Sequence, residues 1–153
     1  MPSWVPRRAK TLGVTPTFLT SHDDVVARHL ALFDVFLDVA EEYALPIRHG
    51  YNFGSTSLDA TAIARRRGHF VVDHTVNWSP GTPLLQLLEG LPEGISEVIV
   101  HPALDSPDVA AVLGDAAARV TALNELLTLT PADIAEKLGI TTLTWPQITT
   151  SSR

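Results

Sequence analysis

The sequence of 153 residues contains no cysteine. This absence excludes disulfide bonds, thiolate nucleophiles and zinc sites built from thiolates. Any bound metal ion would therefore depend on histidine, aspartate or glutamate side chains, and the chain contains six histidines.

Positive charge is also scarce. Eleven Lys and Arg residues stand against 17 Asp and Glu residues, which gives a formal net charge of −6. Nucleic acids and anionic membrane surfaces attract clustered basic residues, so neither is expected as a partner. No uninterrupted run of about eighteen apolar residues occurs, which argues against a transmembrane helix.

Several motifs are missing as well. The chain has no Gly-x-Ser-x-Gly nucleophile elbow, no P-loop and no Gly-rich dinucleotide-binding loop. These absences disfavour covalent serine catalysis and nucleotide binding. The first residues carry charge but not the apolar core of a secretory signal, so a cytoplasmic location is expected.

The remaining pattern is typical of an α/β protein. Hydrophobic residues make up 45% of the chain, enough for one core of ordinary size. We predict one α/β domain over residues 13–150, preceded by a poorly ordered segment over residues 1–12. Strands are predicted at residues 17–21, around 46–49, and at 69–73, 94–100 and 140–143; helices at residues 25–43, 57–67, 83–91, 108–113, 115–127 and 132–138. About five strands alternating with helices predict mainly parallel pairing through right-handed crossovers.

Two predicted strands lead into a histidine beside carboxylates. His22 is followed by two aspartates, and His101 is followed by Pro102 and, three residues later, Asp105. An α/β enzyme presents polar groups at the carboxyl edge of its sheet, and imidazole and carboxylate suit zinc or magnesium. His101 fits a general acid or base that Asp105 orients. On composition alone, a helix cap with a solvated loop histidine is the slightly better interpretation of the His22 segment, and a strand-to-loop junction is an equally good interpretation of His101.

Other polar residues have two interpretations each. His74 follows the third predicted strand, and Arg48 follows the second, where its guanidinium suits bidentate binding of a carboxylate. A surface cation is an equally good interpretation of Arg48. The run Arg65 to Arg67 is interpreted as a solvated helix end that the helix dipole favours.

The order of these segments resembles the YdjC-like carbohydrate deacetylases. That family has a Thr-His-Leu-Asp-Ser-His segment, then a long helix ending in tyrosine and a Leu/Ile-Pro-x-Arg strand, and later a His-Pro-Gly/Ala segment before a helix with an arginine. The corresponding segments here are residues 17–22 (TFLTSH), 42–48 (EYALPIR), 96–107 (SEVIVHPALDSP) and 119–127 (RVTALNELL). Residues 134–143 are similar to the family's closing helix and strand.

The resemblance implies a (β/α) barrel-like fold, a divalent metal ion (Zn²⁺ or Mg²⁺) and removal of an N-acetyl group from an amino sugar or oligosaccharide. It implies that His22 is a metal ligand and that His101 is the general acid that protonates the leaving amine. Arg48 and Asp105 are the candidates for binding or orienting the substrate.

The chain also departs from the family pattern. The family opens with an Asp-Asp motif on its first strand, which has no counterpart upstream of Thr17, and Thr20 replaces the aspartate before Ser-His. We therefore expect a C-terminal portion of such an enzyme with an incomplete active site. A noncatalytic sugar-binding or scaffold module is the alternative, and an unrelated metal hydrolase using His22, His74 and His101 is a third possibility. An open sheet edge predicts a homodimer or a partner that covers it.

Overall fold

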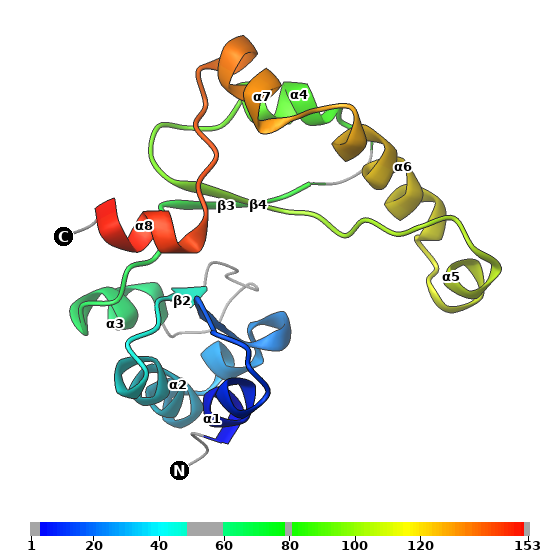
Figure 1. Ribbon diagram of the computed structural model, residues 1–153. Coiled ribbons are helices and arrows are strands. Elements are labelled where there is room, and N and C mark those ends of the chain that lie inside the picture. Colours follow the sequence, from blue (N-terminus) through cyan, green and yellow to red (C-terminus); the bar gives the residue numbers. More distant parts are fainter. Residues whose placement is uncertain (1–3, 49–59, 79–80, 152–153) are drawn as a thin grey trace. The chain divides into compact units, whose positions relative to one another are not determined.

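The computed structural model describes residues 4–48, 60–78 and 81–151 of the chain. The chain divides into two compact units. The first unit comprises Met1–Val72 and Leu143–Arg153, and the second unit comprises Asp73–Thr142. Both combine helices with short parallel strands (Figure 1), so the α/β class predicted from the sequence is confirmed.

The first unit is built around one parallel strand pair. Its elements are α1 (Trp4–Thr11), β1 (Leu19–Thr20), the 3₁₀ helix η1 (His22–Arg28), α2 (Leu30–Glu42), β2 (Ile47–Arg48), α3 (Ala60–Arg66) and α8 (Trp145–Ser151). Strand β1 pairs with β2 so that Leu19 is opposite Ile47 and Thr20 is opposite Arg48. The long connection through η1 and α2 makes the parallel direction possible.

Helix α2 supplies half of the buried residues of the hydrophobic cluster in the first unit. Its apolar residues recur at helical spacing, so that Phe33, Leu37 and Ala40 lie on one buried face. This face packs with other buried residues of the unit, namely Phe36, Ile47, Ala60, Ala64 and Val71. Burial of a side chain such as Phe33 stabilises the fold by about 1.5–3 kcal/mol.

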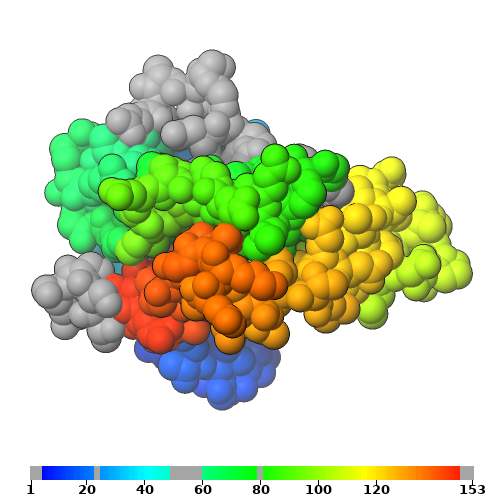
Figure 2. All heavy atoms as spheres, turned by 90° about the horizontal axis from the view of Figure 1, so that it is seen from above, coloured from blue at the N-terminus to red at the C-terminus, as the bar shows by residue number. Residues whose placement is uncertain are grey.

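The second unit contains β3 (His74–Asn77), α4 (Leu84–Glu89), β4 (Ser96–Ile99), α5 (Pro107–Val112), α6 (Ala116–Leu127) and α7 (Pro131–Leu138). Strands β3 and β4 are parallel, with His74 opposite Ser96 and Asn77 opposite Ile99. Helices α4, α6 and α7 contribute to one apolar cluster around Trp78. The surface view shows α6 and α7 side by side (Figure 2).

Local signals set the ends of α7 as the sequence predicts. The Thr130 hydroxyl accepts a hydrogen bond from the backbone N–H of Asp133 (3.1 Å), and the Asp133 carboxylate accepts one from the Thr130 N–H (2.8 Å). The hydrogen bond from the Thr130 hydroxyl lowers the pKa of Asp133. Gly139 ends the helix with a φ of 66°, a conformation that glycine adopts without strain.

Three predicted elements differ in the structure. Residues 22–28 form a 3₁₀ helix and α2 begins only at Leu30, because His29 between them is extended (φ −135°). The third strand begins at His74 instead of residue 69, and the buried Val71 and Val72 precede it. Residues 140–143 form no strand within the described part of the chain; Ile140 packs against the core of the second unit instead.

Two further predictions concern the order of the N-terminal segment and the boundaries of the domain. Residues 1–12, expected to be poorly ordered, include helix α1, whose Lys10 ammonium lies 5.0 Å from the centre of the Tyr43 ring. The single domain over residues 13–150 stays a prediction. No helix among the described residues is long and apolar enough to span a membrane.

The start of β3 is tied to the turn before β4 by two side chains. Asp73 Oδ2 accepts a hydrogen bond from Ile95 N (2.9 Å), and His74 Nε2 lies 3.0 Å from the Glu93 carbonyl oxygen. Gly94 sits in this turn with a φ of 114°, and a Cβ added there would lie 2.8 Å from Asp73 Oδ2. The turn therefore requires glycine both for its conformation and for the close approach of Asp73.

Replacing Gly94 with alanine is expected to lower the free energy of unfolding by about 1–3 kcal/mol, because the backbone is strained and the Asp73–Ile95 hydrogen bond is displaced. Equilibrium unfolding in urea measures this change. Gly114→Ala is the matched control, since Gly114 has no atom within 4 Å of an added Cβ and no positive φ. Equal stabilities for the two variants would contradict the role assigned to the turn.

Candidate functional site

His101 lies on the loop that follows β4. The strand ends at Ile99, and the His101 side chain is exposed to solvent. The loop is attached to α6 by a hydrogen bond from the backbone N–H of Ala103 to the carbonyl oxygen of Arg119 (3.2 Å). Further along, Ser106 caps α5 by accepting a hydrogen bond from Val109 N (3.2 Å). His101 is thus presented at the carboxyl end of a strand by a loop that is fixed at two places.

An ion pair at the start of α6 lies next to this loop. Arg119 Nε donates a hydrogen bond to Asp115 Oδ1 (2.8 Å), four residues earlier on the same helix. This hydrogen bond is the main reason that the pKa of Asp115 lies below its ordinary value, and the charge of His101 lowers it further.

The sequence predicts Asp105 as the carboxylate that orients His101, and it does not single out Asp115. Asp105 lies in the same loop as His101, and its side chain is exposed. Its proposed role in orienting His101 stays a prediction. The available signal for Asp115 was its spacing of four residues from Arg119 at the start of a predicted helix, which favours an ion pair.

His22 and Arg48 lie at one edge of the first unit. Parallel pairing places Thr20 opposite Arg48 at the carboxyl ends of β1 and β2, and His22 begins η1 two residues after Thr20. His22 is exposed and Arg48 is half-buried. The structure thus brings these two predicted residues to the same strand ends. The side chains of the two aspartates after His22, and His49 after Arg48, lie outside the described residues.

The predicted site residues are divided between the two units. His22 and Arg48 belong to the first unit, and His101 and Asp105 belong to the second. Among the described residues, no group of three or more His, Asp or Glu side chains is arranged to hold a metal ion. The described residues therefore do not by themselves supply the ligand set of a zinc or magnesium site.

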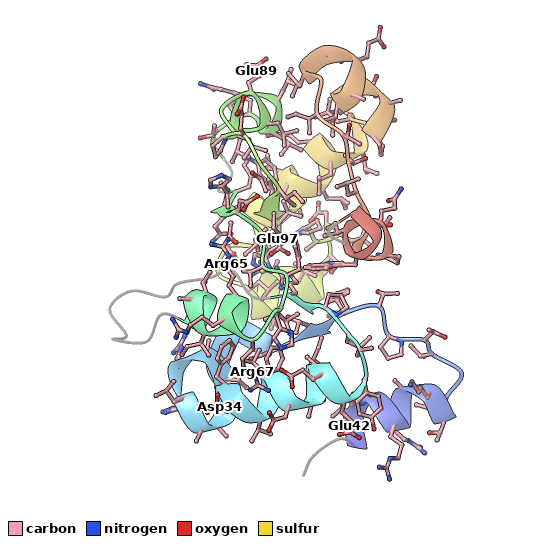
Figure 3. All side chains as sticks on the ribbon, turned by 90° about the vertical axis from the view of Figure 1, so that its left-hand side faces the viewer. Asp34, Glu42, Arg65, Arg67, Glu89 and Glu97 are labelled. Atoms are coloured by element: carbon pink, nitrogen blue, oxygen red, sulfur yellow. The ribbon has the colours of Figure 1, made fainter. Side chains whose placement is uncertain are left out.

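Three other polar residues have structural contacts. His74 lies at the start of its strand, not after one, and contacts the Glu93 carbonyl, as described above. His69 Nε2 lies 3.3 Å from Glu41 Oε1. Arg67, which had been interpreted as part of a solvated helix end, binds carboxylates of α2: its Nη2 lies 2.7 Å from Asp38 Oδ1 and 2.8 Å from Glu41 Oε1. Figure 3 shows Arg67 reaching toward the helix that carries Asp34.

These ion pairs fasten the segment after α3 to α2. The hydrogen bond with Asp38 is the main reason that the pKa of Arg67 is raised. Arg67 is therefore already engaged, and it is a weaker candidate for binding an anionic substrate than the sequence alone allows.

Comparison with known proteins identifies similar chains. The chain matches the family model of YdjC-like proteins over residues 7–139. A curated carbohydrate deacetylase from Thermoanaerobacter pseudethanolicus is 34% identical over 102 residues, which are 63% of this chain and 38% of that protein. A crystal structure from Enterococcus faecalis, described as a cellobiose-phosphate cleavage protein, matches with a TM-score of 0.67 at 22% identity.

That structural match covers 92% of this chain and 55% of the Enterococcus faecalis chain, and it shows that the two share a fold. The chain thus spans less than two thirds of the length of either relative. This partial coverage fits the resemblance to the C-terminal portion of the family.

Proposed function

The chain belongs to the YdjC-like protein family, and from this premise we propose that it is a carbohydrate deacetylase-like hydrolase whose substrate is an N-acetylated amino sugar or oligosaccharide. The observation that carries the proposal is the family match over residues 7–139, supported by 34% identity to a carbohydrate deacetylase. A cytoplasmic location is part of the same proposal.

In this proposal His101 is the general acid. Hydrolysis of an acetamide requires a proton for the leaving amine, and imidazole is the side chain best suited to supply one near neutral pH. The exposure of His101 on a loop after β4 supports this role, since a substrate could reach it there. Asp105 on the same loop and Arg48 at the end of β2 are proposed to bind or orient the sugar.

A divalent metal ion, Zn²⁺ or Mg²⁺, enters the proposal through His22 as a ligand. The described residues do not complete a ligand set around it, so no step of the reaction is assigned to the metal. Thr20 stands where the resemblance places an aspartate of the family. We therefore propose that the site carried by this chain is incomplete.

A noncatalytic sugar-binding or scaffold module is the second candidate function. The replacement of a family aspartate by Thr20 favours it, because such a module keeps the fold and the sugar contacts without the full set of reacting groups. The two candidates differ in a measurable way, since only the hydrolase releases acetate.

We expect the purified chain, supplied with zinc or magnesium, to release little or no acetate from N-acetylglucosamine oligomers. An enzyme-coupled acetate assay measures the release, and isothermal titration calorimetry with the same oligomers measures sugar binding. His101→Ala is the matched variant. Rapid acetate release that is lost in His101→Ala would show that the site is complete, whereas binding without release would favour the sugar-binding module.

The unpaired edges of the strands favour association of this chain with a partner chain. Each sheet among the described residues has two strands, so each strand leaves one edge without a neighbour in its sheet. Exposed parallel edges are sites of association, because their backbone groups can pair with another chain. We propose a homodimer, with a different partner chain as the alternative.

Sedimentation equilibrium is expected to give twice the 16.5 kDa mass of the chain, with dissociation on dilution. Dimers are expected because pairing at the edges satisfies backbone donors and acceptors and buries apolar side chains. The single-chain mass at every concentration, together with no binding of a hydrophobic dye, would contradict the proposed association.

A further inference from the structure

Helix α5 leaves its apolar side chains uncovered in the second unit. None of its residues is buried, and Val112 at its last position is 80% exposed. Leu104, in the loop just before the N-cap residue Ser106, is 74% exposed. Figures 1 and 2 show α5 at the end of α6 away from α4 and α7, which form the apolar cluster. A helix as short as α5 is marginal in water, so contact with another surface would stabilise it.

An acidic residue lies between these two apolar residues. Asp108 comes four residues after Leu104 and four residues before Val112, and its side chain is exposed. Within α5 this spacing places Asp108 and Val112 on the same face of the helix. Residues 68–118 contain no Lys or Arg, and the nearest cation along the chain, Arg119, is already paired with Asp115. The face is therefore apolar and negatively charged.

Helix α1 carries the same pattern with the opposite charge. Val5, Arg8 and Leu12 are spaced by three and four residues, and the backbone N–H of Leu12 donates a hydrogen bond to the Arg8 carbonyl oxygen (3.1 Å), which continues the helical turn. The three side chains therefore share one face. Val5 and Leu12 are more than half exposed, and Arg8 is exposed as well. Residues 1–22 contain no Asp or Glu, so this face is apolar and positively charged.

We propose that α5 of one chain docks against α1 of a second copy of this chain, so that Asp108 meets Arg8 between apolar contacts. The inference rests on the homodimer proposed above, and it names the side chains that the two copies present to each other. Burial of the apolar side chains supplies the attraction, and the opposite charges fix the register. Every chain carries both faces, so a two-fold dimer makes the contact twice.

Charge reversal tests this contact in the full chain. Arg8→Glu and Asp108→Lys are each expected to raise the dissociation constant of the dimer about tenfold in sedimentation equilibrium, because like charges then meet at both copies of the contact. Both side chains are exposed, so neither change disturbs the core. Glu136→Lys, at an exposed position of α7, is the matched control and is expected to leave the dissociation constant unchanged.

An equimolar mixture of the two variants separates a contact between chains from a change within one chain. In a mixed dimer the reversed α1 meets the reversed α5, and the native α1 meets the native α5, so both contacts again join opposite charges. The mixture is therefore expected to recover the native dissociation constant within about threefold. Mixing would not repair an unfolded α5 or a contact made inside one chain. Absence of recovery would overturn the proposal.

Val112→Ser tests the apolar part of the contact. This variant is expected to raise the dissociation constant about tenfold, because the valine loses its burial in both copies of the contact. Val25→Ser, at an exposed valine of the first unit, is the control and is expected to have no effect. Dimers of native strength in all these variants would overturn this inference and leave the homodimer proposed from the strand edges standing. A single-chain mass for the unchanged protein would overturn both.

Discussion

Parallel pairing is the constraint on which the arrangement of both units depends. Two parallel strands must be joined by a crossover, and here η1 and α2 connect β1 to β2, while α4 lies between β3 and β4. The carboxyl ends of parallel strands lie at the same edge, so the residues that follow them are brought together. In the first unit, His22 follows the carboxyl end of β1 and Arg48 stands at the carboxyl end of β2. In the second unit, His101 follows the carboxyl end of β4.

Helix α6 connects the stability of the second unit to its candidate site. Its Ala122 is buried in the apolar cluster, and its Glu125 accepts a hydrogen bond from the N–H of Leu84 (2.8 Å) at the start of α4. A carboxylate in this position stabilises a helix N-terminus. The other end of α6 holds the His101 loop through Arg119. The packing of α6 against the core therefore also fixes the surroundings of His101.

The sequence predicts the parts of this structure that local interactions determine. Helix α7 is bounded by a capping threonine and a glycine, and both act within a few residues of the chain. The start of β3 was predicted wrongly, since it depends on contacts between Asp73, His74 and the turn at residues 93–95, about twenty residues away. The hydrogen bond from Ala103 to Arg119 was not predicted for the same reason, because it joins two separate elements of the chain.

The candidate residues of the proposed site are divided between the two units. His101 and the residues that attach its loop to α6 belong to the second unit. His22 and Arg48 belong to the first unit, and the described residues add no further ligand set around His22. The contacts that fix the His101 loop and the strand pairing that positions His22 and Arg48 therefore belong to different units. A sugar-binding module and an incomplete hydrolase, the two functions proposed above, are both compatible with these folds.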